Sequence, residues 1–268
     1  MSGISIATFN VNSVKARLGN LLAWLDAARP DIVFLQELKC TDDTFPAMEI
    51  EERGYNIATH GQKTYNGVAI LSRIALEAPH SMAMAESDHK RHIAVRLPDG
   101  RELHNFYVPA GGDIPDAEQN PAYGFKLRFV EAMTDWSKAR KNAAPAIIVG
   151  DFNIAPHEHD VWSSRQLRNV VSHTEPEITR LNALLSSHSW CDVGRHFVPR
   201  EQKLYSWWSY RNRDWRKSDR GRRLDHIWVS PTLAPALKTF EALKDARDWQ
   251  IEGGCGPSDH VPLMMEIA

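Results

Sequence analysis

Short apolar runs that end in a polar residue recur along the whole chain, and they restrict the fold more than any other feature. ISIATFN (4–10), DIVFLQE (31–37) and PAIIVGDFN (145–153) are too short for buried helices and are rich in the β-branched residues typical of strands. The same pattern predicts further strands at 67–73, 92–98, 102–109, 222–230 and 260–268.

Helical segments alternate with these runs. Residues 17–30 carry leucines at helical spacing and end at Pro30, residues 125–140 carry one apolar stripe, and residues 178–187 follow the same period. A Pro-, Gly- or Ser-rich linker, a low-complexity tract and a charge block are all absent from the sequence. We therefore predict one domain, spanning 1–268, in which helices cover the sheets of an α/β or α+β sandwich.

Composition excludes several classes of protein. Hydrophobic residues make up 43% and charged residues 25%, as in ordinary globular proteins, and the formal net charge of -2 gives no global sign of a nucleic-acid partner. Cys40, Cys191 and Cys255 show neither disulfide-framework nor zinc-site spacing. The N-terminus does not resemble a signal peptide, and no run reaches the roughly 18 to 20 apolar residues of a membrane span. The sequence predicts a soluble cytoplasmic protein.

Polar residues stand at the ends of five predicted strands. They are Asn10, Glu37, Asp151, Asp225 and the Ser-Asp-His triplet at 258–260. Buried carboxylates are costly unless they are paired, hydrogen-bonded or bound to a metal, and oxygen ligands suit Mg²⁺ or Mn²⁺ better than zinc. If these groups converge, they predict a divalent-cation site. Alternatively, each polar residue ends its own strand independently, and spacing alone leaves both readings open.

The segment Val-Gly-Asp-Phe-Asn at 149–153 illustrates the pattern. Strand alternation predicts that Asp151 and Asn153 share one face, while Phe152 points into the core. We expect Gly150 to let the backbone approach a ligand closely.

Six segments, in order, resemble the exonuclease III / AP endonuclease family of the endonuclease–exonuclease–phosphatase superfamily. They are TFNVNS (8–13), LQELK (35–39), NFYVPAGG (105–112), GDFNIAP (150–156), RRLDHIWVS (222–230) and SDHVP (258–262). The resemblance covers nearly the whole chain and implies a DNase I-like four-layer sandwich of two packed mixed β-sheets flanked by helices. It also implies a phosphodiester hydrolase that depends on Mg²⁺, with Mn²⁺ as a possible substitute and one or two ions bound. The expected activities are 3′→5′ exonuclease on duplex DNA, AP endonuclease 5′ to abasic sites, and 3′-phosphatase or 3′-phosphodiesterase. The implied partner is double-stranded DNA, especially abasic or 3′-blocked DNA, bound by a monomer.

The resemblance also implies roles for individual residues. Glu37 is expected to be the principal metal ligand, with Asn10 beside it, and Asn12 nearby is expected to contact the DNA. Asp151 orients or deprotonates the attacking water, and Asn153 hydrogen-bonds Asp151 or the phosphate.

The remaining implied roles lie toward the end of the chain. Asp259 belongs to the metal-side network, and His260 contacts a non-bridging phosphate oxygen. Asp225 fixes the tautomer of His260 and raises its pKa, while Tyr107 approaches the scissile phosphate or the leaving group. If a second ion binds, the implied ligands are Asp151, Asn153, Asp259 and His260.

Residues 204–225 form the most unusual stretch by composition. Seven Arg or Lys stand against three Asp, with three Trp and two Tyr interleaved. Basic side chains bind phosphates and aromatic rings stack on bases and sugars, so the stretch predicts a DNA-binding surface. The alternative is a solvated basic loop with its tryptophans in the core. Trp208 or Trp215 can be core residues in either case.

Within this surface, the resemblance implies that Trp207 and Leu224 line a pocket for a flipped abasic deoxyribose. Arg211 is expected beside the lesion, and Arg222 is a further DNA contact. Lys126 and Arg128, in the predicted central helix, are expected to contact phosphates.

One position departs from the family pattern. Ala110 stands where many members carry an amide, and Asp113 follows soon after. This puts one phosphate contact in doubt, and with it the balance between AP-site incision and exonuclease action. The HEHD stretch at 157–160 is expected to be a polar loop rather than a metal site, and His92 and His104 are expected to be structural.

Two other functions compete with the nuclease. A superfamily phosphatase acting on a lipid or phosphoinositide usually has His at the position of Tyr107 and lacks the basic tryptophan segment. A non-catalytic DNA-binding module would have lost Glu37, Asp151 or His260, and all three are present.

Overall fold

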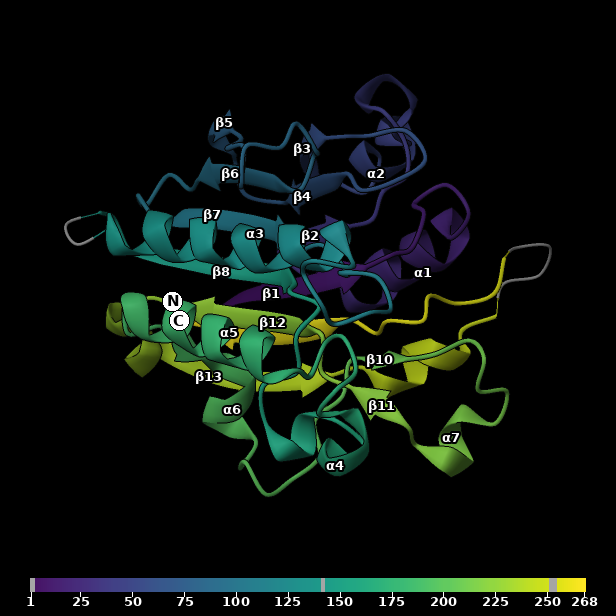
Figure 1. Ribbon diagram of the computed structural model, residues 1–268. Coiled ribbons are helices and arrows are strands. Elements are labelled where there is room, and N and C mark those ends of the chain that lie inside the picture. Colours follow the sequence, from purple (N-terminus) through teal and green to yellow (C-terminus); the bar gives the residue numbers. More distant parts are fainter. Residues whose placement is uncertain (1–2, 141–142, 251–254) are drawn as a thin grey trace.

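The computed structural model describes residues 3–140, 143–250 and 255–268, and within them the strands form two six-stranded sheets (Figure 1). The first sheet has the order β13-β14-β1-β2-β4-β3. Its strands are β1 (Ile4–Asn10), β2 (Ile32–Gln36), β3 (Asn56–His60), β4 (Val68–Ser72), β13 (Leu237–Ala242) and β14 (Leu263–Ile267). The second sheet has the order β5-β6-β7-β8-β12-β9. Its strands are β5 (Glu77–His80), β6 (His92–Arg96), β7 (Glu102–Tyr107), β8 (Ala146–Asp151), β9 (Cys191–Asp192) and β12 (Asp225–Val229).

Both sheets are mixed, because β1 pairs with β2, and β7 with β8, in parallel while the other pairs are antiparallel. A short ribbon of β10 (Trp207–Trp208) and β11 (Gly221–Arg222) stands apart from them. The α-helices are α1 (Leu18–Ala28), α2 (Ala47–Glu51), α3 (Pro121–Lys138), α4 (Ser164–Leu167), α5 (Glu175–Ser187), α6 (Val193–Phe197) and α7 (Trp215–Ser218). Short 3-10 helices span 42–44, 158–160, 231–236 and 244–248. Among the described residues, no helix combines the length and hydropathy needed to cross a bilayer.

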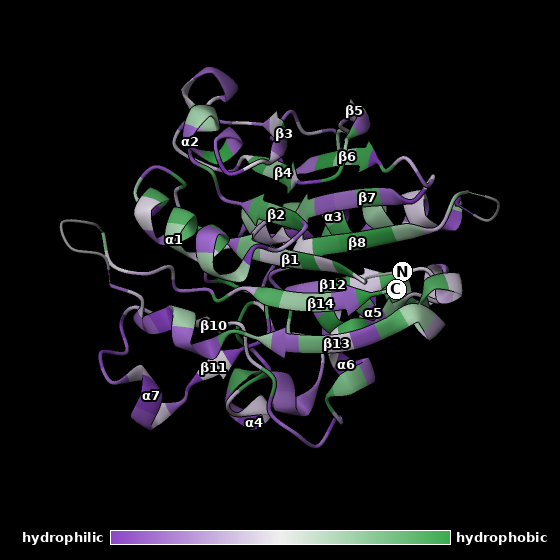
Figure 2. Ribbon diagram, turned by 180° about the vertical axis from the view of Figure 1, so that it is seen from behind, coloured by the Kyte–Doolittle hydropathy of each residue, from purple (hydrophilic) through white to green (hydrophobic). Residues whose placement is uncertain are grey.

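Alternation along the strands divides the core into layers. Ile147 and Val149 face the first sheet and join its Ile6 in one apolar cluster, whereas Ile148 faces outward into another. Helices cover the two outer faces: α1 packs on the first sheet, and α3 and α5 pack on the second, where Figure 1 shows them in front of the strands. Figure 2 shows the apolar residues concentrated in the central strands. The expected four-layer DNase I-like sandwich is confirmed.

Buried amides link the two sheets. The Gln36 side chain donates to Asn105 Oδ1 (2.8 Å), and the Asn105 side chain donates to the carbonyls of Leu35 and Ala69 (both 2.9 Å). Both amide side chains are fully buried, so losing either partner would leave polar groups unsatisfied in the core. These hydrogen bonds fix how the sheets sit against each other just below the ends of β1 and β2.

The helix predictions are confirmed, with different starting points. Helix α3 begins at Pro121 rather than residue 125, because the Asn120 side chain caps it by accepting from the amide of Ala122. Helix α5 begins at Glu175 rather than residue 178, because Thr174 and Glu177 form a capping box. The sequence analysis missed β3, β5, β9, β10 and β13. Strands β3, β5 and β13 carry exposed polar residues and lie at sheet edges, so they lack the apolar pattern that marks the central strands. Strands β9 and β10 are only two residues long.

The expectation for Gly150 is wrong. Its φ is +140°, and a Cβ at this position would lie 1.9 Å from the carbonyl oxygen of Phe106 on β7. The glycine is therefore required by close packing of neighbouring strands and not by the approach of a ligand.

We predict that Gly150→Ala lowers the free energy of unfolding by about 3 kcal/mol or more, because backbone strain adds to a clash between strands. Gly100→Ala is the matched control, since Gly100 also has a positive φ (+89°) but has open space around it. That control should cost about 1 kcal/mol. Urea unfolding measures both, and equal losses in the two variants would contradict the clash.

Two buried histidines form a hydrogen-bonded chain in the second sheet. The amide of Met82 donates to His92 Nδ1 (3.0 Å), and His92 Nε2 lies 3.1 Å from His104 Nδ1. Burial lowers the pKa of His92 well below its usual value, and neighbouring histidines add to the effect. Burial also lowers the pKa of His104 to about 4, although Glu102 opposes the shift. As expected, both histidines are structural.

The folded protein resists protonation of this pair, whereas in the unfolded chain histidines titrate near pH 6.5. The unfolded state therefore binds more protons below pH 6.5, and we predict that stability falls toward pH 4. Each histidine should contribute up to about 1.4 kcal/mol per pH unit. Urea unfolding between pH 7 and 4.5 should show a shallower loss in the His92→Gln/His104→Gln double variant. The control His89→Gln removes an exposed imidazole. If the double variant lost as much stability between pH 7 and 4.5 as this control, the acid sensitivity could not be assigned to His92 and His104.

Candidate active site

Three predicted site residues form one row across the second sheet. Tyr107 and Asp151 are register partners on β7 and β8, and Asp225 is the register partner of Asp151 on β12. Their exposed fractions are 9%, 1% and 0%. Pairing between strands thus brings together groups that are 44 and 74 residues apart in the sequence (151 − 107 and 225 − 151).

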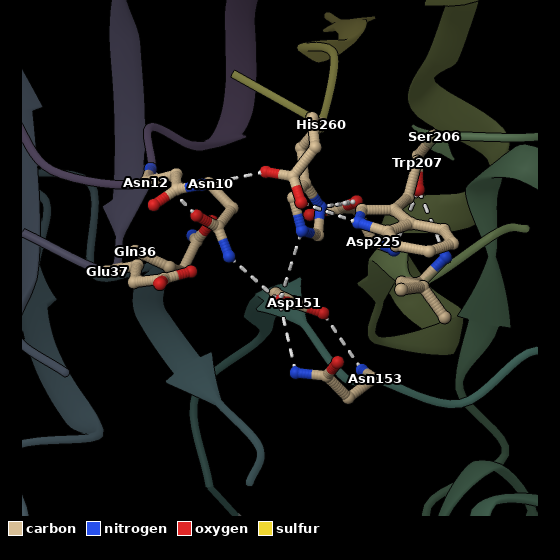
Figure 3. A network of polar contacts seen from close by, with 12 residues as sticks. Asn10, Asn12, Gln36, Glu37, Asp151, Asn153, Ser206, Trp207, Asp225 and His260 are labelled. Carbon is tan, nitrogen blue, oxygen red and sulfur yellow. Dashed lines mark hydrogen bonds and ion pairs between the residues drawn. The ribbon is translucent and has the colours of Figure 1, made fainter. Parts of the chain in front are cut away.

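The first sheet supplies the facing groups. Asn10 ends β1 in register with Gln36, the last residue of β2, and Glu37 follows directly. The Asn10 side chain donates to Asp151 Oδ2 (2.9 Å), so the two sheets meet in a direct polar contact (Figure 3). Convergence of the strand-end groups, which spacing left open, is therefore present in the structure.

His260 completes the centre of the site. Its Nδ1 lies 2.8 Å from Asp225 Oδ2, and its Nε2 lies 3.8 Å from Asp151 Oδ2. Ser258 holds this segment in place by donating to the carbonyl of Asn10 (2.8 Å) and accepting from the His260 amide (3.2 Å). Figure 3 shows the imidazole between the two carboxylates.

Burial and charge set the protonation of these groups. Burial alone lowers the pKa of His260, but the negative charges of Asp225 and Asp151 raise it to about 10, so the imidazole is a cation at neutral pH. Burial raises the pKa of Asp151 to about 7, against the effect of His260. Burial, with the charges of Glu37 and Asp151, raises the pKa of Tyr107 well above its usual value. The Tyr107 phenol is thus a stable hydrogen-bond donor.

Several site residues have a left-handed backbone. The φ angles are 44° at Asn12, 59° at Glu37, 55° at Lys39 and 53° at Asn153. Such conformations cost non-glycine residues of order 1 kcal/mol each and persist only where neighbouring contacts hold them. Two hydrogen bonds hold Asn153. Its backbone amide donates to Asp151 Oδ1 (2.9 Å), and its side-chain amide donates to the carbonyl of Val108 (3.0 Å).

Asp151 and Asn153 share the site, although not by strand alternation as expected. Strand β8 ends at Asp151, and the left-handed turn at Asn153 brings its side chain back to Asp151 Oδ2 (3.1 Å). Phe152 packs into the core as predicted, with its ring edge-to-face against Trp228 at 5.1 Å.

A chain of polar contacts runs from Glu37 to the aromatic side of the site. Lys39 Nζ lies 2.9 Å from Glu37 Oε1 and donates to Asn12 Oδ1 (2.7 Å). Asn12 in turn donates to one carboxylate oxygen of Asp259 (3.0 Å), and the Trp207 indole donates to the other (2.9 Å). Asp259 therefore lies in a polar network with Asn12 and Trp207.

The donor set suits a hard divalent cation. Within the described part of the chain, oxygens of Asp151 and Asp225 and a nitrogen of His260 lie within 4.8 Å of one another, and the buried Asp225 Oδ1 has no hydrogen-bond partner. Because His260 already pairs with Asp225, the oxygen atoms are the more suitable ligands. Glu37, with a side chain 20% exposed, faces the same space as Asp151 and remains accessible. Carboxylate and amide oxygens at such a site fit Mg²⁺ or Mn²⁺.

A pocket of about 820 Å³ opens over the row of polar groups. Its polar lining includes Glu37, Tyr107, Asp151, Asp259 and His260. An apolar cluster (the apolar end) adjoins these groups through Trp207, which donates to Asp259. The lining residues of this cluster are Trp162, Leu167, Val170, Trp207 and Leu224, and Val171, Arg211, Arg220 and Arg222 also line the pocket. The pocket thus combines groups suited to a phosphate with an apolar surface beside them.

The sequence analysis missed part of the apolar end. Trp162, Leu167, Val170 and Val171 lie just past the HEHD stretch, in a segment to which the sequence analysis assigned no structure. A tryptophan two residues beyond that stretch was the only available sign. In the structure, the Arg220 guanidinium lies over the Trp162 ring at 4.7 Å.

Arg222 and Arg211 both line the pocket. Arg222 is fixed: its guanidinium lies 5.4 Å from the Trp207 ring and donates to the Val171 carbonyl (3.0 Å) and Ser172 Oγ (2.7 Å). Arg211 is exposed at the rim.

The expectation for Lys126 is wrong. Its side chain is fully buried, and its ammonium contacts Glu177 and the carbonyls of Ala110 and Asn153. Three acceptors already surround this group, so a DNA phosphate cannot reach it. Arg128 is exposed but is not among the pocket residues, and its contact with DNA stays a prediction.

Of two other sequence interpretations, one is supported. Trp208 and Trp215 are core residues, with exposed fractions of 1% and 6%. The HEHD stretch is a short capped 3-10 helix at 158–160 and not the expected loop, and its Asp160 is buried and pairs with Arg195 and Arg223.

Comparison with known proteins places this geometry in context. Exodeoxyribonuclease III from Haemophilus influenzae is 30% identical over 274 residues, which cover 97% of this chain and 98% of the relative. The structure of an AP endonuclease from Archaeoglobus fulgidus matches with a TM-score of 0.89 at 30% identity, over 98% of this chain and 99% of that one. The 3′-5′ exonuclease NExo from Neisseria meningitidis also gives a TM-score of 0.89, at 31% identity, over 98% of this chain and 99% of that one. The sequence model of the Endonuclease/Exonuclease/phosphatase family matches residues 7–260, and the chain belongs to this family.

Proposed function

We propose that this chain is a divalent-metal-dependent DNA-repair phosphodiesterase. It incises DNA 5′ to abasic sites, removes nucleotides 3′→5′ from duplex ends, and clears 3′-phosphate or 3′-phosphodiester blocks. The carrying observation is the geometry of His260, which pairs with Asp225 at 2.8 Å and lies 3.8 Å from Asp151 in a pocket with an apolar end. The similarity to an AP endonuclease, an exonuclease and a 3′ phosphatase bound to a product DNA hairpin supports this proposal.

The side chains divide the reaction between them. His260 binds a non-bridging oxygen of the scissile phosphate, and Tyr107 donates a hydrogen bond to the same phosphate or to the leaving oxygen. Asp151 accepts a proton from the attacking water, whose oxygen bonds to phosphorus as the bond to the 3′ oxygen breaks. The leaving 3′ oxygen takes up a proton and becomes a hydroxyl. Asn153 and Asn10 hold the carboxylate of Asp151 in place.

A Mg²⁺ or Mn²⁺ ion held by Glu37 with Asn10 would supply neutralisation of charge on the phosphate. In a version with two ions, Asp151, Asn153, Asp259 and His260 would hold the second. The contacts of Asp259 with Asn12 and Trp207, and of His260 with Asp225, favour the version with one ion.

The proposed partner is double-stranded DNA. An abasic deoxyribose fits the apolar end beside Trp207 and Leu224, and Arg211, Arg222 and the exposed Arg128 are the proposed contacts with the DNA. Ala110 lines the pocket but has no side-chain amide, so its side chain offers no hydrogen bond to a phosphate. We further propose that residues 1–268 act as one domain and as a monomer in the cytoplasm.

We predict that the protein nicks a duplex with one abasic analogue in Mg²⁺ and stops when EDTA is added. Asp151→Asn and Glu37→Gln should each lower the rate by about 10²- to 10⁴-fold, because they remove the proton acceptor and the metal ligand. Denaturing gels measure incision beside an intact duplex, and the exposed Asp135→Asn is the control. Undiminished incision by Asp151→Asn would show that Asp151 is not the proton acceptor. If the protein cleaved a phosphoinositide in vesicles and left the abasic duplex intact, the substrate would be a lipid and not DNA.

A further inference from the structure

A buried ion pair lies directly behind the pocket. Lys126 Nζ, from α3, lies 2.5 Å from Glu177 Oε1, from α5, and both side chains are fully buried. The same ammonium donates to the carbonyls of Asn153 (2.7 Å) and Ala110 (3.1 Å). Its three N–H groups therefore meet three acceptors, and none of these contacts involves the reacting phosphate.

Glu177 binds a third segment. Its carboxylate accepts from the amides of Ser172 (2.9 Å) and Thr174 (3.0 Å) and from the Thr174 hydroxyl (2.7 Å). Ser172 lines the pocket, and its hydroxyl accepts from Arg222, which lies over the Trp207 ring. The acid end of the pair is thus connected to the apolar end of the pocket.

One ion pair in this way joins three pocket-lining segments. They are the loop at 108–112, the turn at 151–155 and the loop at 170–174. The stem of Lys126 also fills the space behind the first loop, since a Cβ on Gly111 would lie 2.8 Å from Lys126 Cδ. The pair is the point at which helices α3 and α5 meet all three segments.

Stability alone is a weak explanation for this arrangement. Desolvation of two charges offsets much of their attraction, and buried ion pairs can often be replaced by apolar residues without loss of stability. A charged pair does supply what apolar residues lack, namely directional hydrogen bonds to defined carbonyl and amide groups.

We propose that Lys126 and Glu177 are positioning residues that fix Asn153 and the 108–112 loop relative to the phosphate. The effect on turnover rests on the proposed function, whereas the effect on Asn153 does not. Lys126 acts on Asn153 through the backbone carbonyl, and the Asn153 side chain in turn holds Asp151. Glu177 fixes the 170–174 loop in the same way, by accepting hydrogen bonds from the amides of Ser172 and Thr174.

The kinetic test compares three variants. Lys126→Met removes the charge, and Lys126→Met/Glu177→Gln leaves no unpaired charge while keeping an acceptor at residue 177. Arg180→Met is the matched control, because Arg180 and Glu131 pair across the same two helices at 2.7 Å on the surface. We expect kcat on the abasic duplex to fall about 10- to 100-fold in both Lys126 variants, because small misplacements of catalytic groups cost this much. KM should change little, and the control should match the wild type.

Urea unfolding separates positioning from stability. The double variant should recover most of the stability that Lys126→Met loses but none of the kcat, since the contacts to Ala110 and Asn153 stay absent. A double variant with wild-type kcat would overturn the proposal, as would a loss of kcat in Arg180→Met equal to that in Lys126→Met.

A spectroscopic readout keeps the test independent of the substrate. The Asn153 side-chain amide can be assigned in a ¹H–¹⁵N spectrum by its disappearance in Asn153→Asp. We expect its resonances to shift in both Lys126 variants and to stay in place in Arg180→Met. Unmoved resonances in Lys126→Met would refute the inference. If the wild type cleaves no DNA substrate, the proposed function is wrong. The shift of the Asn153 side-chain resonances then remains as the test of whether Lys126 and Glu177 position Asn153.

Discussion

The hydrogen bonds of Gln36 and Asn105 between the two sheets are the constraint on which the site depends. Each half of the site belongs to a different sheet, with Asn10 and Glu37 on one side and Asp151 and its row on the other. A slip between sheets would separate these halves, and buried amides resist such a slip because their unpaired groups would find no water. The hydrogen bond from Asn10 to Asp151 is a second contact between the two sheets, at the site itself.

Much of this arrangement could be predicted from the sequence, because central strands carry strong apolar patterns and polar groups at their ends. The edge strands could not, since β5 is exposed along its whole length. Lys126 was misread for a physical reason: a lysine on an amphipathic helix is normally solvated, and its buried partner Glu177 lies 51 residues away (177 − 126) without any local sign. Gly150 was misread because close packing between β7 and β8 depends on tertiary structure.

The basic segment at 204–225 has a structural role beside its proposed role in binding DNA. Arg223 is buried in ion pairs with Asp160 and Asp192, and Arg216 pairs with Asp245 and Asp248. These cations hold the segment on the fold, which leaves fewer of the seven positive charges for a ligand than composition suggests. Recognition of DNA by such a surface depends on shape and on a few placed arginines more than on net charge.

The pairing of β1 with β14 has a practical consequence. Ile4 and Ile267 are register partners, and the chain markers in Figure 1 lie side by side. Asn10 lies six residues further along β1, roughly 20 Å away at the rise of an extended strand. The first residues of β1 and the last residues of β14 therefore lie far from the pocket. A tether to a solid support or a fused reporter at this end of the two strands leaves the pocket open, so the protein suits immobilised single-molecule assays.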